Sequence, residues 1–176
     1  MDVDKVIETW NREEQESFTG WDFSHLDGRM IEEQAPWSYS TRASELMRQA
    51  ASVIDMGTGG GERFLKLQEH WPGKVVATEE YPPNLKLATQ RLSPHGAQVV
   101  EVQLTEVGQI PFADGEFELV LNRHSGFNPT EVARILAPGG TFLTQQVHGL
   151  WAADLLRVFN AKPQWPDATL EKYVPC

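Results

Sequence analysis

The sequence is poor in cysteine, the residue that forms disulfides and binds metals through its thiolate. It contains one cysteine, Cys176, at the last of its 176 positions. A single cysteine forms no intrachain disulfide and no thiolate metal cluster. Four histidines show no metal-ligand spacing, and we assign none of them to a metal: His25, His70, His95 and His148.

Basic residues are also scarce. Lys and Arg number 15 against 25 Asp and Glu, which gives a net charge of −10. This balance excludes a general nucleic-acid or anionic-membrane surface, which needs clustered cations, although it does not exclude a local basic groove. No apolar run approaches the length of a membrane-spanning helix, and the acidic N-terminal stretch lacks the pattern of a signal peptide. We therefore expect a cytoplasmic protein that binds neither nucleic acid nor membrane.

The composition, 40% hydrophobic and 23% charged, predicts one globular domain. We divide it into an N-terminal helical and aromatic covering segment (1–50), an α/β core (51–148) and a C-terminal helical segment (149–176). Residues 1–16 predict a polar helix with one apolar stripe. Four aromatic residues of the covering segment either fill a core or close over a ligand as a lid: Trp21, Phe23, Trp37 and Tyr39.

Short apolar runs alternate with helical stretches along the core. The predicted strands are 52–56, 74–79, 98–102, 118–122 and 141–147. The predicted helices are 41–50 (capped by Ser40), 62–70, 83–92, 129–136, 150–160 and 168–173. This alternation indicates βαβ units, a parallel sheet and helices on both faces. Ligands of such sheets bind where the strand order reverses, at the carboxyl ends of the strands, and strand 52–56 is the natural place.

The stretch SVIDMGTGGGE follows directly from that strand. Its four glycines within five residues, at positions 57, 59, 60 and 61, suit neither a helix nor a strand. A strand, a glycine loop and a helix together turn backbone N–H groups toward a ligand, and the glycines allow its close approach. The alternative is a tight turn with no ligand.

Two familiar nucleotide loops fit this stretch poorly. A phosphate-binding P-loop needs Lys followed by Ser or Thr after its last glycine, and Glu62 and Arg63 stand there instead. A dinucleotide loop needs glycine at its first, third and sixth positions. Gly57 and Gly59 satisfy the first two, but Glu62 occupies the sixth, which disfavours that cofactor without excluding it.

A resemblance supplies the third possibility. VIDMGTGGGE resembles motif I of the class I S-adenosylmethionine-dependent methyltransferases, in which an acidic residue precedes Gly-x-Gly-x-Gly. Three later stretches resemble, in the same order, that family's second strand, fourth-strand region and Pro-Gly-Gly turn with fifth strand: KVVATEEYPPNLKLA, IPFADGEFELVLNRH and EVARILAPGGTFLTQQV. The likeness covers about residues 50–148 and is nearest to bacterial methyltransferases of the small-molecule type.

The resemblance implies a Rossmann-like methyltransferase fold, a doubly wound and mostly parallel α/β sheet, whose 51–148 core binds S-adenosylmethionine. An acidic loop suits this cofactor, which carries a cationic sulfonium and ammonium and no phosphate. Asp55 would accept a hydrogen bond from the ammonium; its alternative role is to anchor the loop. The loop residues assigned to the cofactor are Gly57, Thr58, Gly59 and Gly61.

Further cofactor contacts are implied at the ends of the later strands. Glu79 would accept both ribose hydroxyls, with its neighbour Glu80 as the fallback and an exposed strand-end carboxylate as the alternative. Tyr81 would pack on the adenine. Glu106 matches the position that binds the adenine amino group. Asn122 would face the methionine portion or the substrate.

Methyl transfer by in-line displacement requires alignment and exclusion of water, and it needs neither a metal nor a catalytic triad. His124 is the candidate general base, although a hydrogen-bonded structural histidine is the favoured interpretation. Arg123 would pair with Glu131 or Asp154, or else bind a substrate carboxylate; we favour the ion pair.

The chain departs from the family at its C-terminus, where two further strands usually follow. We therefore expect a sheet shortened to about five strands, with strand 141–147 at an exposed edge that invites a homodimer. The predicted function is methyl transfer to a small molecule. The alternative is a catalytically incompetent cofactor-binding or dimeric interaction module, with a dinucleotide oxidoreductase as a distant third.

Overall fold

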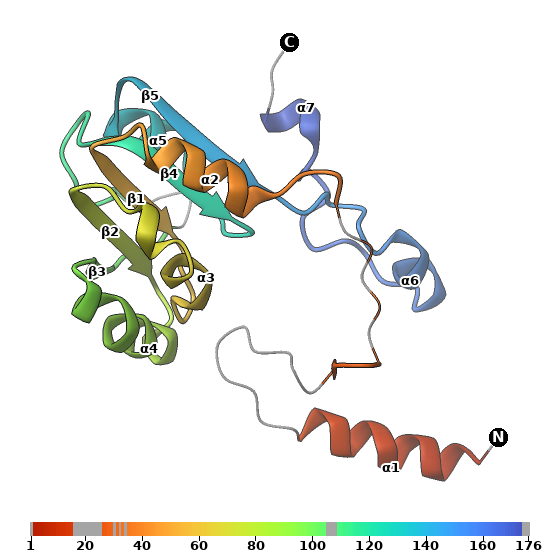
Figure 1. The fold of residues 1–176 in the computed structure, drawn as a ribbon. Helices are drawn as coiled ribbons and strands as arrows, with labels where there is room; N and C mark the ends of the chain where they lie inside the picture. The colour runs from red at the N-terminus through yellow and green to blue at the C-terminus, as the bar shows by residue number, and fades with distance from the viewer. Residues whose placement is uncertain are drawn as a thin grey trace.

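The computed structural model describes residues 2–15, 26–29, 31, 33, 35–104 and 109–173. Its centre is one sheet of five parallel strands in the order β3-β2-β1-β4-β5 (Figure 1). The strands are β1 (Ser52–Met56), β2 (Lys74–Glu79), β3 (Gln98–Glu101), β4 (Phe117–Arg123) and β5 (Leu136–Gln145). The predicted α/β fold class is confirmed, with five strands in the part of the chain that the structure describes.

Helices alternate with these strands along the chain. They are α1 (Val3–Glu14), α2 (Tyr39–Met47), α3 (Glu62–Leu65), α4 (Pro82–Leu92), α5 (Pro129–Ile135), α6 (Ala153–Val158) and α7 (Leu170–Tyr173), with 3-10 turns at Gln68–His70 and Ser93–His95. The strand order reverses between β1 and β4, because the chain builds outward from β1 to β3 and then returns to the other side of β1. The carboxyl ends of β1 and β4 therefore flank the point where a ligand of such a sheet binds.

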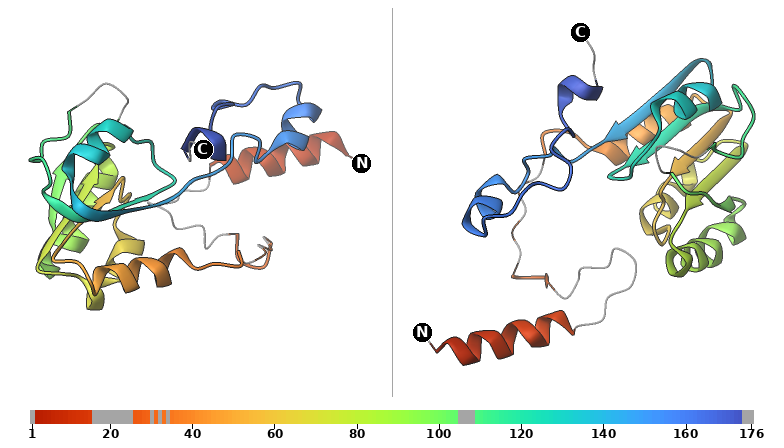
Figure 2. Two further views of the ribbon diagram at one scale, coloured as in Figure 1. Left: turned by 90° about the horizontal axis from the view of Figure 1, so that it is seen from above. Right: turned by 180° about the vertical axis from the view of Figure 1, so that it is seen from behind.

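Both faces of the sheet are covered, as a doubly wound fold requires. On one face, side chains of β1, β2 and β4 pack against α2, α3 and α4, with Met47, Phe64 and Leu92 in that layer. On the other face, Ile54 and neighbouring strand residues pack against α5, including Ile135. Each fully buried side chain of this size contributes about 1.5–3 kcal/mol. Figures 1 and 2 show the two layers of helices with the sheet between them.

The N-terminal end of α2 lies earlier than expected. The helix begins at Tyr39 and ends at Met47, whereas the sequence predicted residues 41–50. Ser38, not Ser40, is the N-cap, and its hydroxyl accepts a hydrogen bond from the backbone N–H of Thr41 at 3.1 Å. A cap at Ser38 satisfies a free N–H of the first turn. This shift places the ring of Tyr39 on the helix instead of in a loop.

The segment predicted as one helix over 62–70 is broken into α3 and a 3-10 turn at Gln68–His70. The chain folds back between them, which brings Phe64 and Trp71 into ring contact with centroids 4.9 Å apart. This packing, which joins residues seven positions apart on a bent segment, stabilises the break. The other core helices agree with their predicted ranges to within one residue at either end.

Strand β5 begins at Leu136, ahead of the expected start at 141. The Pro-Gly-Gly sequence predicted as a turn is a bulge within the strand, where Phe117 pairs with Leu136 and Leu119 pairs with Thr141. The chain therefore advances by five residues along β5 where it advances by two residues along the paired part of β4. A Cβ at Gly140 would lie 2.9 Å from two backbone carbonyl oxygens, so glycine permits the bulge. The strand ends at Gln145 instead of 147.

The terminal helices lie apart from the sheet (Figures 1 and 2). Helix α1 forms as predicted but buries none of its residues, and Arg29 holds it through two hydrogen bonds to Glu13, of 2.7 and 2.9 Å. Helices α6 and α7 are shorter than the predicted 150–160 and 168–173. In the part of the chain that the structure describes, no helix has the length and apolar character needed to cross a membrane.

Candidate functional site

A cleft of about 160 Å³ opens at the carboxyl ends of β1, β2 and β4. Its wall combines the glycine loop, the end of β2, the start of α4 and the loop after β4. The lining residues are Gly57, Gly59, Glu79, Glu80, Asn84, Leu104, Arg123, His124 and Ser125. The cleft therefore lies where the reversed strand order predicts a ligand site. It brings together six of the residues singled out from the sequence: Gly57, Gly59, Glu79, Glu80, Arg123 and His124.

The glycine loop turns sharply out of β1. Gly57, Gly59 and Gly61 have φ angles of 69°, 64° and 83°. The turn is fastened to β2, because Thr58 donates its backbone N–H to the carbonyl oxygen of Thr78 at 2.8 Å. A Cβ at Gly57 would lie 2.3 Å from Oγ of Ser125, so a side chain is excluded there by both conformation and space.

Glu79 is the buried anchor of this loop. Glu79 is the last residue of the buried strand β2, and it is 6% exposed. One carboxylate oxygen accepts the N–H of Gly59 at 2.7 Å, and the other accepts the N–H groups of Glu80 and Tyr81 at 3.1 and 2.9 Å. A carboxylate offers about four acceptor positions, so room for a further donor remains. The interpretation of Glu79 as an exposed strand-end carboxylate is wrong.

A second clamp on the loop comes from α4 and was not found from the sequence. Arg91 donates to the carbonyl oxygen of Gly60 at 2.8 Å and forms an ion pair with Glu62. A Cβ at Gly60 would lie 2.6–2.7 Å from these two side chains, which explains the glycine between them. Glu62, whose presence argued against a dinucleotide, thus has a structural partner. No local spacing signals this pair, because the two residues lie on different elements.

Asp55, near the end of β1, is half-buried beside the loop. Burial raises the pKa of Asp55 to about 7; the Thr58 hydroxyl opposes this rise, and the carboxylate of Glu79 adds to it. Desolvation penalises the charged form of a carboxyl group, and a nearby positive charge would favour it. Asp55 is not among the residues that line the cleft, and a cationic group beside it would favour its charged form.

The loop after β4 is held by the end of β5. Asn122 is fully buried, and its side-chain oxygen accepts hydrogen bonds from Gln146 Nε2 at 2.5 Å and Thr144 Oγ1 at 3.3 Å. Gln146 also donates to the carbonyl oxygen of Ser125 at 3.2 Å. Asn122 thus joins the two strand ends and is not among the residues that line the cleft. No local pattern predicts this network, because it depends on contacts between strands.

His124 has a left-handed backbone conformation, with φ 59°. Its N–H donates to the carbonyl oxygen of Gln145 at 2.9 Å, and its ring Nε2 lies 3.2 Å from the side-chain nitrogen of Gln145. Burial lowers the pKa of His124, and the positive charges of Arg123 and Arg63 lower it further. Non-glycine residues held in this conformation gather at functional sites.

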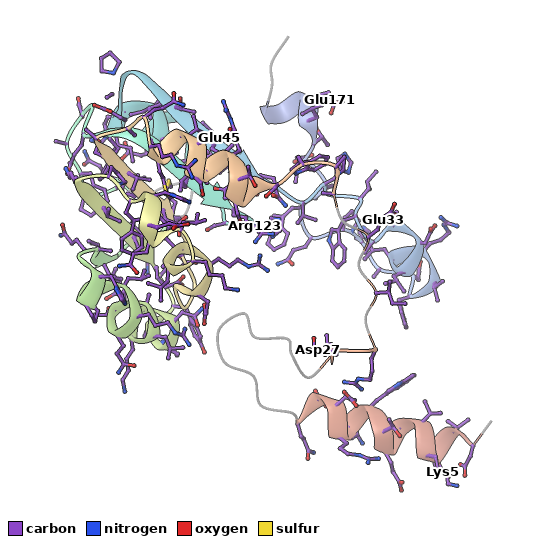
Figure 3. All side chains as sticks on the ribbon, viewed as in Figure 1. Lys5, Asp27, Glu33, Glu45, Arg123 and Glu171 are labelled. Atoms are coloured by element: carbon purple, nitrogen blue, oxygen red, sulfur yellow. The ribbon has the colours of Figure 1, made fainter. Side chains whose placement is uncertain are left out.

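Arg123 does not take part in the expected ion pairs. Figure 3 shows it at the end of β4, near α2, and its guanidinium carbon lies 5.9 Å from the centre of the Tyr39 ring. Glu131 instead pairs with Arg134 at 2.7 Å, and Asp154 pairs with Arg157 within α6. Each of the two carboxylates pairs with the arginine three residues later in its own helix. Side chains at this spacing are neighbours on the surface of a helix. The predicted pairing of Arg123 with Glu131 or Asp154 is wrong.

Several predicted features fall outside the described residues. Glu106 does so, as do Trp21 and Phe23 of the proposed lid. Tyr81 is described and is 58% exposed beside the cleft. Within the described ranges, no group of three or more His, Cys, Asp or Glu side chains is arranged to hold a metal ion.

Comparison with known proteins now identifies the class. Residues 53–140, half of the chain, match the family model described as a methyltransferase domain. The chain therefore belongs to this methyltransferase family, and the cofactor that the family implies is S-adenosylmethionine. The site suits that cofactor: the loop excludes side chains at Gly57, Glu79 keeps an acceptor position, and Asp55 offers a carboxylate for a cation.

Individual relatives differ in what they methylate. The chain is 30% identical over 125 residues to a demethylmenaquinone methyltransferase of Thermus thermophilus, covering 65% of this chain and 56% of that protein. It is 28% identical to a 23S rRNA (guanine(748)-N(1))-methyltransferase of Streptomyces fradiae, covering 70% and 44%. The chain spans about half the length of these relatives. The family therefore defines the reaction class and not the acceptor.

Solved structures agree on the fold. A SAM-dependent methyltransferase from Aquifex aeolicus superposes with a TM-score of 0.54 at 17% sequence identity, covering 73% of this chain and 69% of that one. The doubly wound core is thus the methyltransferase fold, as the resemblance in the sequence implied.

Proposed function

We propose that this chain binds S-adenosylmethionine in the cleft beside the glycine loop and transfers its methyl group to a small-molecule acceptor. The observation that carries the proposal is the buried carboxylate of Glu79. It fixes the glycine loop through Gly59 and keeps an acceptor position at the mouth of the cleft. An acidic residue there serves a cofactor with an unmodified ribose.

The cofactor contacts proposed are those that the resemblance to the family implies. Asp55 binds the ammonium of the methionine portion, and Glu79 binds the ribose hydroxyls, with Glu80 as the alternative. Tyr81 packs on the adenine, and Glu106 binds the adenine amino group. When bound, the cofactor supplies a methyl group on a sulfonium, an electrophile that needs no activation by a metal. The protein contributes alignment and the exclusion of water.

The loop after β4 lies on the acceptor side of this arrangement. Asn122 keeps the ends of β4 and β5 together and thereby positions the loop. His124 lines the cleft and, because its pKa is lowered, is neutral at physiological pH. A neutral imidazole is the form that accepts a proton, so His124 is the general base of the proposal where the acceptor is protonated.

Calorimetric titration of the full chain with S-adenosylmethionine, S-adenosylhomocysteine and NADH tests the cofactor. We expect binding in the micromolar range for the first two and none for NADH. Binding of NADH alone would overturn both methyl transfer and the cofactor-binding alternative, and would favour the oxidoreductase.

The acceptor class needs a separate measurement. We expect isotopically labelled methyl groups from S-adenosylmethionine to enter the fraction of a cell extract below about 1 kDa, the size range of a small-molecule site. Label found in RNA would contradict the small-molecule acceptor. Binding of the cofactor with no label in either fraction would favour the second candidate, an inactive cofactor-binding module.

We further propose that the chain forms a homodimer through β5 and acts in the cytoplasm. Strand β5 is the last in the sheet order, so one side of its backbone lacks a neighbouring strand within the described sheet. Such an edge favours pairing with another chain. Size-exclusion chromatography with light scattering should give twice the mass of the 19.8 kDa chain, and a stable monomer would contradict the pairing.

A further inference from the structure

A second cavity, of about 330 Å³, lies between the N-terminal end of α2 and the carboxyl end of β5. It is lined by Trp37, Ser38, Tyr39, Arg42, Leu143, Thr144, Gln145 and Gln146. Two of these residues, Trp37 and Tyr39, belong to the lid that the sequence offered as one possibility, and the other six were assigned to no ligand. The volume falls at the lower end of the range of small-molecule sites, which suits a ligand of about one or two rings.

The second cavity adjoins the cofactor cleft through two pairs of side chains. Tyr39 lines the second cavity, and the guanidinium of Arg123, a residue of the cleft, lies over the ring of Tyr39. Gln145 lines the second cavity and contacts the ring of His124, also a residue of the cleft. The Tyr39 hydroxyl points back to the carbonyl oxygen of Leu143 at 3.4 Å. A molecule in the second cavity is thus one layer of side chains from the cleft.

The walls of this cavity combine aromatic rings with a positive charge. Trp37 and Tyr39 supply rings, Arg42 supplies a guanidinium, and none of the eight lining residues is acidic. This is notable in a chain of net charge −10. Burial raises the pKa of Tyr39, and the nearby carboxylate of Asp55 raises it further, so the phenol remains neutral and adds no negative charge. The charge on the wall therefore favours an anion.

Arg42 can exchange its present partner at low cost. It pairs with Glu45 at 3.1 Å, and both side chains are about half exposed. Exposed ion pairs of this kind stabilise a protein little, because water and salt screen them. A guanidinium binds a carboxylate with two parallel hydrogen bonds, a geometry that lysine does not offer.

From this arrangement we propose that the second cavity binds a planar aromatic acid. Its ring packs against Trp37 and Tyr39, where aromatic groups prefer tilted or offset contacts. Its carboxylate binds Arg42. Methyl transfer to this ligand is not part of the proposal, because in-line displacement needs reacting atoms about 3–3.5 Å apart and a layer of side chains separates this cavity from the cleft.

Binding of three small probes to the full chain tests the class directly. 4-Hydroxybenzoate has a ring and a carboxylate, 4-hydroxybenzyl alcohol has the ring without the charge, and cyclohexanecarboxylate has the charge without the aromatic ring. Saturation-transfer NMR and calorimetry, with and without S-adenosylhomocysteine, should show 4-hydroxybenzoate binding at least about fivefold more tightly than either other probe. Equal affinities, or no binding of 4-hydroxybenzoate, would overturn the proposal.

Variants locate the site. Arg42→Gln should weaken 4-hydroxybenzoate about tenfold and leave 4-hydroxybenzyl alcohol unchanged, since it removes the charge and keeps a polar side chain. The matched control is Arg48→Gln, the same change at the other end of α2 and outside the cavity. Trp37→Leu, at a residue 65% exposed, should weaken both aromatic probes. An Arg42→Gln protein that binds 4-hydroxybenzoate normally would refute the assignment of Arg42.

Failure of the aromatic-acid proposal can be distinguished from failure of the proposed function. Affinity for S-adenosylhomocysteine is measured on the same samples, and we expect Arg42→Gln to leave it unchanged, because Arg42 does not line the cleft. Cofactor binding without discrimination among the probes would refute the aromatic acid alone. Discrimination among the probes without cofactor binding would refute methyl transfer and retain a site for aromatic acids.

Discussion

The two halves of the sheet's carboxyl edge are built in different ways. At β1 and β2, backbone N–H groups converge on one buried carboxylate, Glu79, and glycines leave no space for side chains. At β4 and β5, uncharged side chains join the strand ends, with Asn122 and Gln146 at the centre. The first half fixes a backbone shape, and the second half can change its side chains while the backbone stays in place. A shared cofactor suits the former, and an acceptor that differs among relatives suits the latter.

The largest effect is expected from Gly57→Ala in the first half. The added Cβ would lie 2.3 Å from Ser125 Oγ at a φ of +69°, so both the loop and its neighbour must move. We expect a loss of about 2–4 kcal/mol in the free energy of unfolding and cofactor binding too weak to measure by calorimetry. The control is Gly126→Ala, where φ is outside the left-handed region and the Cβ meets nothing within 4 Å. Equal losses in the two variants would contradict the steric explanation.

Glu79→Ala is expected to have the next largest effect. It leaves the N–H groups of Gly59, Glu80 and Tyr81 without their acceptor. Affinity for S-adenosylmethionine should fall by about 1–3 kcal/mol, the cost of an unpaired buried polar contact. Calorimetry on Glu79→Ala and Glu80→Ala measures the difference. If only Glu80→Ala weakens binding, the ribose contact belongs to Glu80.

Asp55→Asn tests how the titration of the Asp55 carboxyl changes the free energy of unfolding with pH. Burial raises the pKa of Asp55 from 3.8 to about 7, so between these values the folded carboxyl holds a proton that the unfolded one lacks. The free energy of unfolding should therefore fall as pH rises through this window, by at most about 1.4 kcal/mol per pH unit. Urea unfolding at several pH values, compared with Asp55→Asn, measures this contribution.

Other groups change the pH dependence in the opposite direction. The pKa of His124 is lowered, so its unfolded imidazole takes up a proton first as pH falls, and stability from this source rises with pH. For this reason the informative quantity is the difference between wild type and Asp55→Asn at each pH. A difference that stays constant between pH 4 and 7 would show that Asp55 titrates normally.

Arg91→Ala should have a smaller effect on the first half. It removes the hydrogen bond to the Gly60 carbonyl and the partner of Glu62. We expect cofactor affinity to fall by about 1 kcal/mol, since loop geometry is loosened and no cofactor contact is deleted. Lys86→Ala, an exposed change on the same helix, is the control for loss of a positive charge. Equal effects of both variants would mean that only net charge matters.

The smallest effect on the cofactor is expected from Gln146→Leu in the second half. It removes a donor to Asn122 and to the Ser125 carbonyl, which should lower stability by about 1 kcal/mol. Affinity for S-adenosylhomocysteine should change less than about twofold, as measured by calorimetry. A large loss of affinity would show that the side chains at the ends of β4 and β5 also determine cofactor binding, so that the two halves are not independent.

The sequence predicted the first half better than the second for a physical reason. Strand β1, the glycines and the acidic residue at the end of β2 are local features whose role follows from their order along the chain. The clamp of Arg91 on Glu62 joins elements 29 residues apart, and no periodicity records it. Contacts of Gln145 and Gln146 with the end of β4 likewise depend on strand register. The bulge in β5 hid the true start of that strand, because Pro-Gly-Gly is typical of a turn.

Glu79 stabilises the folded glycine loop whether or not a cofactor is bound. Its carboxylate receives three backbone N–H groups, so the glycine loop would lose its shape without it even in a protein that never transferred a methyl group. Natural selection for a folded loop alone is then enough to retain the acidic residue and the glycines. A descendant that had lost its chemistry would carry the same signature as an active enzyme. The acidic residue and the glycines by which the family is recognised are, in this structure, also the residues that hold the loop in shape.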